Sequence, residues 1–346
     1  YTMTTLIVPA AGLSTRFPGM RPKYALTNWD GQLMIQHAVD PLLNHQHFDR
    51  VIFATLERHD MDKTLKEIYP DSEQMVFHNP TQGPAHTVFG AMRALNVKGP
   101  VVVKDTDSWL TYGDGPIAGN MVATAMIDEF DIPRVAAKSF VKSNTHGFIT
   151  DIVEKSVISN EVSVGCYSFE DAAEVGSRYR TPVGKDEVFL SHVILDMILN
   201  GISFKTYPVA DYVDVGTAEE WKKIQDDHAT YFVDIDGTLV VNQSKYFANK
   251  WTNNPPLIQE NFDRIVQLQA AGACIVLTTA RDETDHAPGD ALMDYFVEQG
   301  LERCTILYGL PHTKRVLVND FSPSNPYPSA SAINVRRDQP DLGDMI

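Results

Sequence analysis

The fold of the first half of the chain is decided by the stretch LIVPAAGLSTRF at residues 6–17. Its first three residues are branched and apolar, which is typical of a buried strand. The small residues at 10–12 let the backbone approach a ligand closely, and consecutive N–H groups there can surround an anionic phosphate. Arg16 adds a forked donor suited to phosphate oxygens, and Lys23 adds a compact positive charge. The stretch therefore predicts a strand that ends in a phosphate-binding loop.

Strand-like and helix-like patterns alternate outward from this stretch. Short apolar runs rich in β-branched residues lie at residues 6–8, 51–54, 101–103 and 135–137, and helical spacing of apolar residues lies at residues 34–43 and 87–95. Such alternation predicts a mostly parallel sheet covered on both faces. Residues 148–169 lack a helical pattern, so we expect an antiparallel or mixed insertion there.

A second alternating unit begins near residue 229, after a polar amphipathic helix at residues 221–228. Its expected strands lie at residues 231–233 and 274–277, near Ile306 and near Val316, and its expected helices lie at residues 258–271 and 291–299. Since 346 residues correspond to about two domains, we predict two Rossmann-like α/β domains, residues 1–228 and 229–346.

The charge balance restricts the partners of the protein. There are 29 Lys and Arg against 45 Asp and Glu, a net charge of −16, which argues against non-specific nucleic-acid binding. No apolar run approaches the roughly 18 residues of a membrane helix, and the three cysteines show no CxxC spacing. We expect a cytoplasmic protein without nucleic-acid or membrane partners, and a homo-oligomer remains open.

Five further motifs follow the phosphate loop in order. They are QGPAHT at residues 82–87, VKDTD at 103–107, EK at 154–155, GCY at 165–167 and DVGT at 214–217. With AAGLSTRF and RPKYAL, they resemble the sugar-phosphate nucleotidyltransferases, the pyrophosphorylase family, although Ser14 stands where that family more often has glycine. The resemblance spans residues 5–225 and implies a mixed-sheet, GT-A-like nucleotidyltransferase fold for the first domain.

The resemblance also implies roles for individual residues. Nucleotide binding falls to Ala10, Ala11, Gly12, Ser14, Thr15, Gln82 and Gly83, and acceptor binding to Glu154, Lys155 and Gly165. Arg16 would bind the departing pyrophosphate, and Lys23 would offset charge at the α-phosphorus. Asp105 and Asp214 would hold Mg²⁺, whereas Asp107 is either a ligand, a helix-capping residue or a carboxylate that supports a ligand.

The implied reaction moves a nucleotidyl group from an NTP to a sugar 1-phosphate and releases pyrophosphate. A small phosphorylated alcohol or amine, as in cytidylyltransferases, is the second choice of acceptor. A GT-A glycosyltransferase is a weaker alternative, because Asp105 and Asp107 also form a D-x-D pattern. Such enzymes lack the phosphate loop with its arginine and lysine.

The second domain carries YFVDIDGTLV at residues 231–240, which places Asp234 and Asp236 on one face just after an apolar strand. This string resembles motif I of the haloacid-dehalogenase-like (HAD-like) phosphatases. The resemblance implies that Asp234 attacks phosphorus and that Asp236 acts as acid and then as base. Thr279 fits motif II, Lys314 motif III and Asp320 motif IV. A second Mg²⁺ would be held by Asp234, Asp320 and the backbone carbonyl of Asp236.

Residues 236–279 leave no room for a sizeable cap, so we expect a capless HAD-like fold. The whole chain is therefore predicted to be a bifunctional nucleotidyltransferase and phosphatase, and the fusion suggests consecutive steps toward a surface-glycan precursor. The alternative is a cytidylyltransferase whose second domain is only a structural or binding module.

Overall fold

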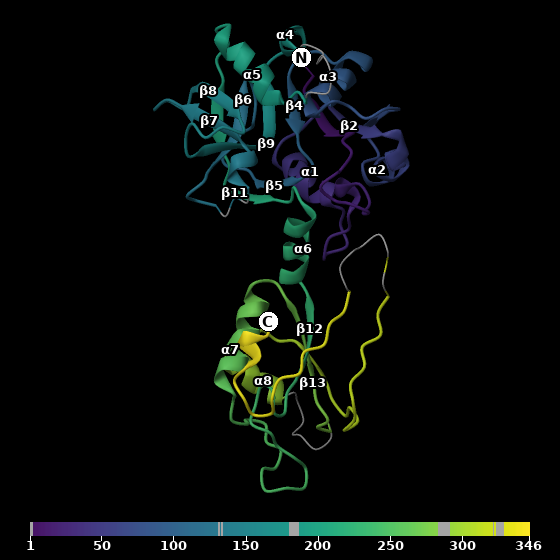
Figure 1. The fold of residues 1–346 in the computed structure, drawn as a ribbon, viewed down its shortest axis with the longest axis vertical. Coiled ribbons are helices and arrows are strands. Elements are labelled where there is room, and N and C mark those ends of the chain that lie inside the picture. Colours follow the sequence, from purple (N-terminus) through teal and green to yellow (C-terminus); the bar gives the residue numbers. More distant parts are fainter. Residues whose placement is uncertain are drawn as a thin grey trace. The chain divides into compact units, whose positions relative to one another are not determined.

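The computed structural model describes residues 3–130, 132, 134–179, 187–282, 291–320, 322 and 329–346. The chain divides into two compact units, Tyr1–Trp221 and Lys222–Ile346 (Figure 1). The division falls inside helix α6, Ala218–Asp227, whereas the sequence pattern places it just after this helix.

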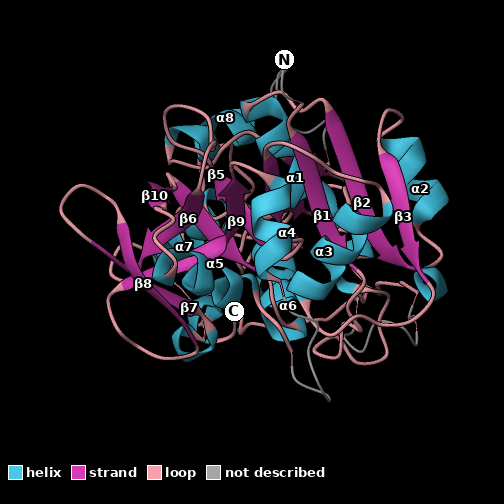
Figure 2. Cartoon of the chain, turned by 90° about the horizontal axis from the view of Figure 1, so that it is seen from above, coloured by secondary structure: helices cyan, strands magenta, loops and turns pink. Residues whose placement is uncertain are grey.

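The first unit is built on a mixed sheet of nine strands. The strands of this unit are β1 (Thr5–Ala10), β2 (Arg50–Leu56), β3 (Glu73–Phe77), β4 (Val101–Lys104), β5 (Ser108–Thr111), β6 (Met121–Met126), β7 (Ser139–Ser143), β8 (Ile149–Glu154), β9 (Glu161–Phe169), β10 (Lys205–Pro208) and β11 (Asp211–Asp214). The main sheet has the order β10-β6-β9-β4-β1-β2-β3, with β7 and β8 attached at β9, while β5 and β11 form a separate antiparallel pair. Figure 2 shows β1, β2 and β3 side by side.

The sheet confirms the mixed α/β fold that the sequence predicts for this unit. Strands β1, β2, β3 and β4 are parallel, and β9 is antiparallel to both β4 and β6. Because Ile7 of β1 pairs with Val103 of β4, the loop after Ala10 and the residues after Lys104 leave the sheet at the same edge. The charged residues that follow β1 and β4 therefore lie at one edge of the sheet.

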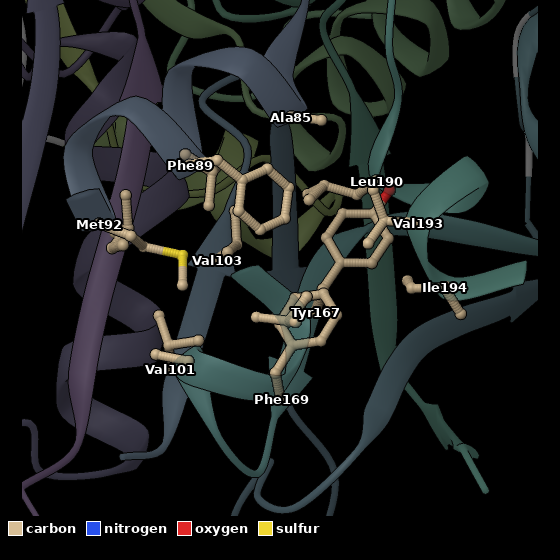
Figure 3. Close-up of a cluster of buried hydrophobic side chains, with 14 of the residues drawn as sticks. Ala85, Phe89, Met92, Val101, Val103, Tyr167, Phe169, Leu190, Val193 and Ile194 are labelled. Atoms are coloured by element: carbon tan, nitrogen blue, oxygen red, sulfur yellow. The ribbon is translucent and has the colours of Figure 1, made fainter. Parts of the chain in front are cut away.

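Helices α1 (Met34–His45), α2 (Asp62–Ile68), α3 (Pro84–Ala94), α4 (Ala172–Arg178) and α5 (Leu190–Leu199) complete the first unit. Figure 3 shows Phe89 and Met92 of α3 and Val193 of α5 above Val103 and Tyr167 of the sheet. Each large apolar side chain buried in this way contributes roughly 1.5–3 kcal/mol. Helix α1 buries Met34, Ile35, Ala38, Val39 and Leu42, the three- and four-residue spacing visible in the sequence.

One expected strand of the first unit is wrong. Residues 135–137 form a 3-10 turn, η3 (Val135–Ala137), and β7 begins only at Ser139. The turn follows Arg134, whose φ of 51° is left-handed and therefore incompatible with an extended strand. Two of the three residues are alanines, which favour strands weakly.

The second unit contains a three-stranded parallel sheet of order β12-β13-β14, with β12 at Thr230–Asp234, β13 at Cys274–Thr278 and β14 at Thr305–Leu307. Helices α7 (Gln259–Ala270) and α8 (Ala291–Glu298) connect the strands and pack Phe262 and Phe296 into the core. None of the described helices of either unit combines the length and apolar content needed to span a bilayer.

The strand expected near Val316 is also absent among the described residues. Val316, Leu317 and Val318 are 71%, 57% and 88% exposed, and the segment has no regular secondary structure. β-branched residues favour a strand only where a neighbour accepts and donates the ladder hydrogen bonds, and this segment has no such neighbour in the described sheet.

Candidate functional site

The loop after β1 has a geometry suited to an anion. Ser14 has a φ of 51°, so the position where glycine is commoner in the resembled family adopts the left-handed conformation that glycine favours. The Ser14 hydroxyl accepts a hydrogen bond from the backbone N–H of Lys23 at 3.1 Å, which ties the two parts of the phosphate-loop motif together. Gly12 has no atom within 4 Å of the point where a Cβ would stand, so space is open beside it.

Two carboxylates follow β4 and meet the cations of this loop. Lys23 forms an ion pair and hydrogen bond with Asp107, and Arg16 Nη2 lies 3.9 Å from the same carboxylate. Burial pushes the pKa of Asp107 upward, but Lys23 and Arg16 hold it far below its usual range. Burial, together with the negative charge of Asp107, raises the pKa of Asp105 to about 6. The pair thus places one strongly ionised carboxylate beside one that resists ionisation.

Lys104, the last residue of β4, is completely buried beside these carboxylates. Its ammonium donates to the carbonyl of Asp105 at 2.8 Å, to the hydroxyl of Ser108 at 2.9 Å and to the carbonyl of Ser108 at 2.5 Å. Burial lowers the pKa of Lys104. The side chain therefore fixes the backbone of the turn that carries Asp105 and Asp107.

Asp214 reaches the same place through the β5–β11 pair. Asp214 is opposite Ser108 in the antiparallel register, and the N–H of Val215 donates to the carbonyl of Asp107 at 2.8 Å. The Asp214 side chain is 5% exposed and binds Lys138 and Arg134, the latter at 3.3 Å. Burial raises the pKa of Asp214, and Lys138 opposes that shift. The pairing of β5 with β11 thus brings Asp214 beside the turn that carries Asp105 and Asp107, so the three carboxylates meet from two segments.

Three charged residues at this edge escaped the sequence analysis. They are Arg134, Lys138 and Glu220. Glu220 accepts hydrogen bonds from Arg134 Nε at 2.7 Å and from Arg134 Nη2 at 3.1 Å. The charges in the segments PRVAAKSF and TAEEW carry no periodic or spacing signal. Only the pairing of segments far apart in the chain shows that they meet.

Two glycines make room in this cluster. Gly165 has a φ of 78°, and a Cβ on it would stand 2.7 Å from the Ser108 hydroxyl and 2.8 Å from Asp105 Oδ2. At Gly216 a Cβ would stand 2.4 Å from Arg134 Nη2 and 3.3 Å from Arg16 Nη1. Both positions can be occupied only by glycine without displacing a charged side chain.

The turn at Gln82 and Gly83 precedes α3. Gly83 has a φ of 97°, and a Cβ there would stand 2.8 Å from the carbonyl of Val188. The carbonyl of Gln82 accepts from Val188 N–H at 3.1 Å, so the turn is held against the segment before α5. The N–H of Gln82 also donates to His86 Nδ1 at 3.1 Å, which gives His86 a role in fixing the turn.

Glu154 and Lys155 do not pair with each other. Glu154 accepts hydrogen bonds from the hydroxyls of Ser139 and Ser191, the latter at 2.8 Å. Lys155 has a φ of 54°, and its ammonium lies 4.4 Å from the centre of the Phe189 ring. Lys155 thus makes a cation–π contact, while Glu154 links β8 to β7 and α5.

The carboxylates around Asp105 offer the oxygen ligands that Mg²⁺ prefers. Within the described ranges, no group of three or more His, Cys, Asp or Glu side chains is arranged to hold a metal ion. Mg²⁺ often binds through one or two carboxylates and substrate phosphates, and a pair of mutually repelling carboxylates is stabilised by a cation, so Asp105 and Asp107 fit. Asp107 and Asp214 are each paired with two cations, but the Asp214 side chain is 5% exposed against 18% for Asp107, so Asp214 fits less well.

In the second unit, the D-x-D-G-T string forms a turn at the end of β12. Asp234 is the last residue of the strand, and Gly237, with a φ of 89°, donates its N–H to the carbonyl of Val240 at 2.8 Å. The hydroxyl of Thr279 donates to Asp236 Oδ2 at 3.2 Å. The structure therefore brings together Asp234, Asp236 and Thr279, which lie 45 residues apart at most.

Cations line this turn as well. Arg281, which is completely buried, binds Asp236 through two hydrogen bonds, and Arg315 Nη2 lies 3.6 Å from Asp234 Oδ1. Burial raises the pKa of Asp234, and Arg315 opposes that shift. Lys314 and Asp320 are exposed, and Asp234, Asp236 and Asp320 do not form a metal-holding group within the part of the chain that the structure describes.

Comparisons with known proteins support the fold of the first unit. No protein-family model matches the chain, and no curated protein sequence matches it. Solved structures do match. A nucleoside-diphosphate-sugar pyrophosphorylase from Vibrio cholerae is 19% identical, with a TM-score of 0.56 over 64% of this chain and 99% of its own. An inositol-1-phosphate CTP transferase from T. maritima is 14% identical, with a TM-score of 0.52 over 65% of this chain and 97% of its own.

A CTP:phosphocholine cytidylyltransferase from Streptococcus pneumoniae is also similar, with 14% identity and a TM-score of 0.54 over 65% of this chain and 98% of its own. These matches cover the N-terminal part of the chain. At such low identity they establish the fold alone, and the HAD-like fold of the second unit stays a prediction. The first unit has the mixed α/β fold of the nucleotidyltransferases.

Proposed function

We propose that the first unit is a Mg²⁺-dependent nucleotidyltransferase that releases pyrophosphate. The observation that carries this proposal is the meeting of Arg16 and Lys23 with Asp107 at the edge where β1 and β4 end. Transfer of a nucleotidyl group brings two phosphate anions together, so catalysis consists mainly of positioning and charge neutralisation. A cluster of fixed cations and carboxylates beside an open phosphate loop suits that task.

In this mechanism a phosphate oxygen of the acceptor attacks the α-phosphorus of the NTP, and the bond to pyrophosphate breaks. Arg16 binds the departing pyrophosphate, and Lys23 offsets the charge that grows at the α-phosphorus. Asp105 and Asp107 would hold Mg²⁺, which when bound offsets the charge of both substrates. The backbone at Ala10, Ala11, Gly12, Ser14 and Thr15 surrounds the NTP phosphates, and Gln82 and Gly83 contact the base.

A sugar 1-phosphate is the first choice of acceptor, and a phosphorylated alcohol or amine is the second. Similar structures include proteins named for sugar nucleotides and proteins named for inositol phosphate and phosphocholine. On this proposal Lys155 and Gly165 lie on the acceptor side of the site. The glycosyltransferase alternative predicts release of a nucleoside diphosphate from an NDP-sugar, with no pyrophosphate.

The test is pyrophosphate release from CTP, GTP, UTP and dTTP with a panel of sugar 1-phosphates, phosphocholine and inositol 1-phosphate. Lys23→Met should lower the rate by at least about 10²-fold, since it removes a charge that acts on the transition state. Lys98→Met, at an exposed lysine, is the matched control and should not change it. Sugar transfer from an NDP-sugar without pyrophosphate chemistry would contradict the proposal.

For the second unit we propose phosphomonoester hydrolysis. Asp234 attacks the phosphorus, the bond to the alcohol breaks, and Asp236 protonates the leaving oxygen. Asp236 then activates the water that hydrolyses the aspartyl phosphate and releases inorganic phosphate. Thr279 binds the phosphoryl oxygens. Lys314 and Asp320 are exposed and form no metal-holding group with Asp234 among the described residues, so no step is assigned to them or to a second Mg²⁺. The support is that Thr279, which follows β13, donates a hydrogen bond to Asp236 on the turn after β12 that also carries Asp234.

Asp234→Asn distinguishes this activity from a purely structural role. Phosphate release from phosphosugars and phosphoalcohols should vanish in the variant, while pyrophosphate release by the first unit persists. If the parent chain releases no phosphate from these esters in the presence of Mg²⁺, the second unit is a structural or binding module. If both activities exist, successive steps in making an activated building block, such as a surface-glycan precursor, are the simplest reason for the fusion.

A further inference from the structure

Two cations at the edge of the first sheet have no place in the reaction as described so far. Lys138, the residue before β7, donates to the carboxylate of Asp214 and to the hydroxyl of Tyr212 at 3.0 Å. Arg134, just before η3, binds Asp214 through Nη2 at 3.3 Å and binds Glu220 through both Nε and Nη2. Their side chains are 14% and 33% exposed, so both are held in place and remain accessible.

Their carboxylate partners are held firmly. The side chains of Asp214 and Glu220 are 5% and 13% exposed. The N–H of Thr217 donates to Glu220 Oε2 at 2.8 Å, so Glu220 is fixed at the start of α6. Asp214 binds both Lys138 and Arg134, and Glu220 binds Arg134 and the backbone at Thr217, so this pair of carboxylates can hold the two cations in a defined geometry.

Both cations keep hydrogen-bond donors for a ligand. An ammonium group has three N–H bonds and a guanidinium has five. Among the described residues, Lys138 uses two of its donors, and the Nη1 group of Arg134 has no hydrogen-bond partner. These donors match the oxygens of a phosphate monoester.

The missing side chain of Gly216 makes room for two guanidinium groups, one from this pair and one from the phosphate loop. Arg134 Nη2 and Arg16 Nη1 lie 2.4 and 3.3 Å from the single point where a Cβ on Gly216 would stand. Lys138 also lowers the pKa values of Asp105, Asp107 and Asp214, so its charge is near all three carboxylates. The pair therefore faces the place where Arg16 and Lys23 approach Asp107.

The reaction needs two separate groups of cations, because two anionic phosphates must meet. Arg16 and Lys23 form one group, on the loop after β1. We infer that Lys138 and Arg134 form the other and bind the phosphate of the acceptor, with Asp214 and Glu220 as the anchors that position them. Asp214 is thereby an anchor of the acceptor site and not a metal ligand. The inference rests on the proposed nucleotidyl transfer for its reaction, but the anion site can be measured without it.

The first experiment uses inorganic phosphate as the probe and measures its binding to the full chain by ³¹P NMR line broadening. The parent should bind phosphate at millimolar concentration, and Lys138→Met should weaken binding by about tenfold or more, the effect of losing one charge-assisted hydrogen bond. Lys138→Arg, which keeps the charge, should stay within about threefold of the parent. Lys142→Met, at an exposed lysine of β7 four residues further along the chain, should bind like the parent.

The second experiment separates an anchor from a metal ligand at Asp214. Asp214→Asn should weaken phosphate binding about tenfold while leaving the affinity for Mg²⁺ alone, measured by calorimetry, unchanged. Once an NTP and acceptor pair is known, Lys138→Met should raise KM for the acceptor about tenfold and change KM for the NTP less than about twofold.

Some outcomes overturn the inference. In the first experiment these are absence of phosphate binding in the parent, parent-like phosphate binding in Lys138→Met, and a loss of phosphate binding in Lys138→Arg equal to that in Lys138→Met. In the second experiment it is a loss of Mg²⁺ affinity in Asp214→Asn with phosphate binding intact. The proposed function fails separately: if Lys138→Met loses phosphate but no substrate pair yields pyrophosphate, the anion site stands and nucleotidyl transfer does not. Normal kinetics in Lys138→Met would contradict the acceptor-phosphate site and leave the proposed nucleotidyl transfer intact.

Discussion

Arg281 and Asp236 form a two-point ion pair in the second unit, with Nε 2.8 Å from Oδ2 and Nη2 2.6 Å from Oδ1. The arginine side chain is fully buried and the aspartate is 15% exposed. The same guanidinium donates to the carbonyl of Thr252 at 2.6 Å and to Gln243 Oε1 at 3.0 Å. Arg281 therefore links the second aspartate of the D-x-D-G-T turn to the segment that follows it.

Replacing Arg281 by methionine should lower the free energy of unfolding of the second unit by about 3–5 kcal/mol, because the largely buried Asp236 then loses its cation and keeps only the hydrogen bond from Thr279. Hydrogen exchange of the β12 and β13 amides measures this loss. Adding Asp236→Asn to the variant should recover part of it. Arg303→Met is the control, since the Arg303–Asp294 pair is more than half exposed and should contribute less than about 1 kcal/mol. Unchanged exchange in Arg281→Met would contradict the prediction.

Gly165→Ala should damage the first site through Asp105. The new Cβ would stand within 2.8 Å of Asp105 Oδ2 at a backbone φ of 78°, so the carboxylate must move and the backbone is strained by about 1–3 kcal/mol. Pyrophosphate release should fall by about 10²-fold, the effect of misplacing a reacting group by about 1 Å.

Gly176→Ala is the matched control for this change. Gly176 lies in α4 with no atom within 4 Å of its Cβ position, and alanine there should stabilise the helix by roughly 0.5–1 kcal/mol. Equal activity of the Gly165→Ala and Gly176→Ala variants would show that the space beside Asp105 is not needed.

The raised pKa of Asp105 predicts a pH dependence of stability without metal. Its pKa is raised from 3.8 to about 6 by burial and by Asp107, so the folded state favours the protonated form. The ionised form destabilises the folded state, and the free energy of unfolding should fall as pH rises from about 4 to about 6. The pKa of Asp107 is lowered, so its stabilising contribution is fully present in this window and does not cancel the trend.

Asp105→Asn isolates this effect, because asparagine stays neutral. In urea unfolding of the first unit with a chelator present, the stability of the variant relative to the parent should rise between about pH 4 and about pH 6 and stay constant above that range. A stability difference that does not change with pH would show that Asp105 titrates normally.

Lys104→Met should loosen the turn that carries Asp105 and Asp107. The carbonyls of Asp105 and Ser108 would lose a donor, each at a cost of about 1–3 kcal/mol for a buried acceptor. Amides 105–108 should exchange faster and pyrophosphate release should fall about tenfold or more. Lys205→Met, at an exposed lysine of β10 that lies over the Phe148 ring, should leave both measurements unchanged.

Local patterns in the sequence determined most elements of both units. Helix α1 follows from apolar spacing, because one face of a helix must be buried whatever it packs against. Strands β1 and β4 follow from runs of branched apolar residues with polar residues after them. Local patterns failed at η3, where a left-handed Arg134 ends the extended backbone, and at Val316, which has no partner strand.

The sequence alone also marked the loops that carry the carboxylates and the phosphate motif, since these follow predicted strands. Which residues meet there was decided by the tertiary structure. Lys138 and Asp214 are 76 residues apart, and they are joined only because β5 pairs with β11 and because β7 attaches to β9. A single lysine in an otherwise apolar segment has no periodicity to reveal a partner. Contacts between distant segments depend on strand order and register, which are set by the packing of the whole sheet.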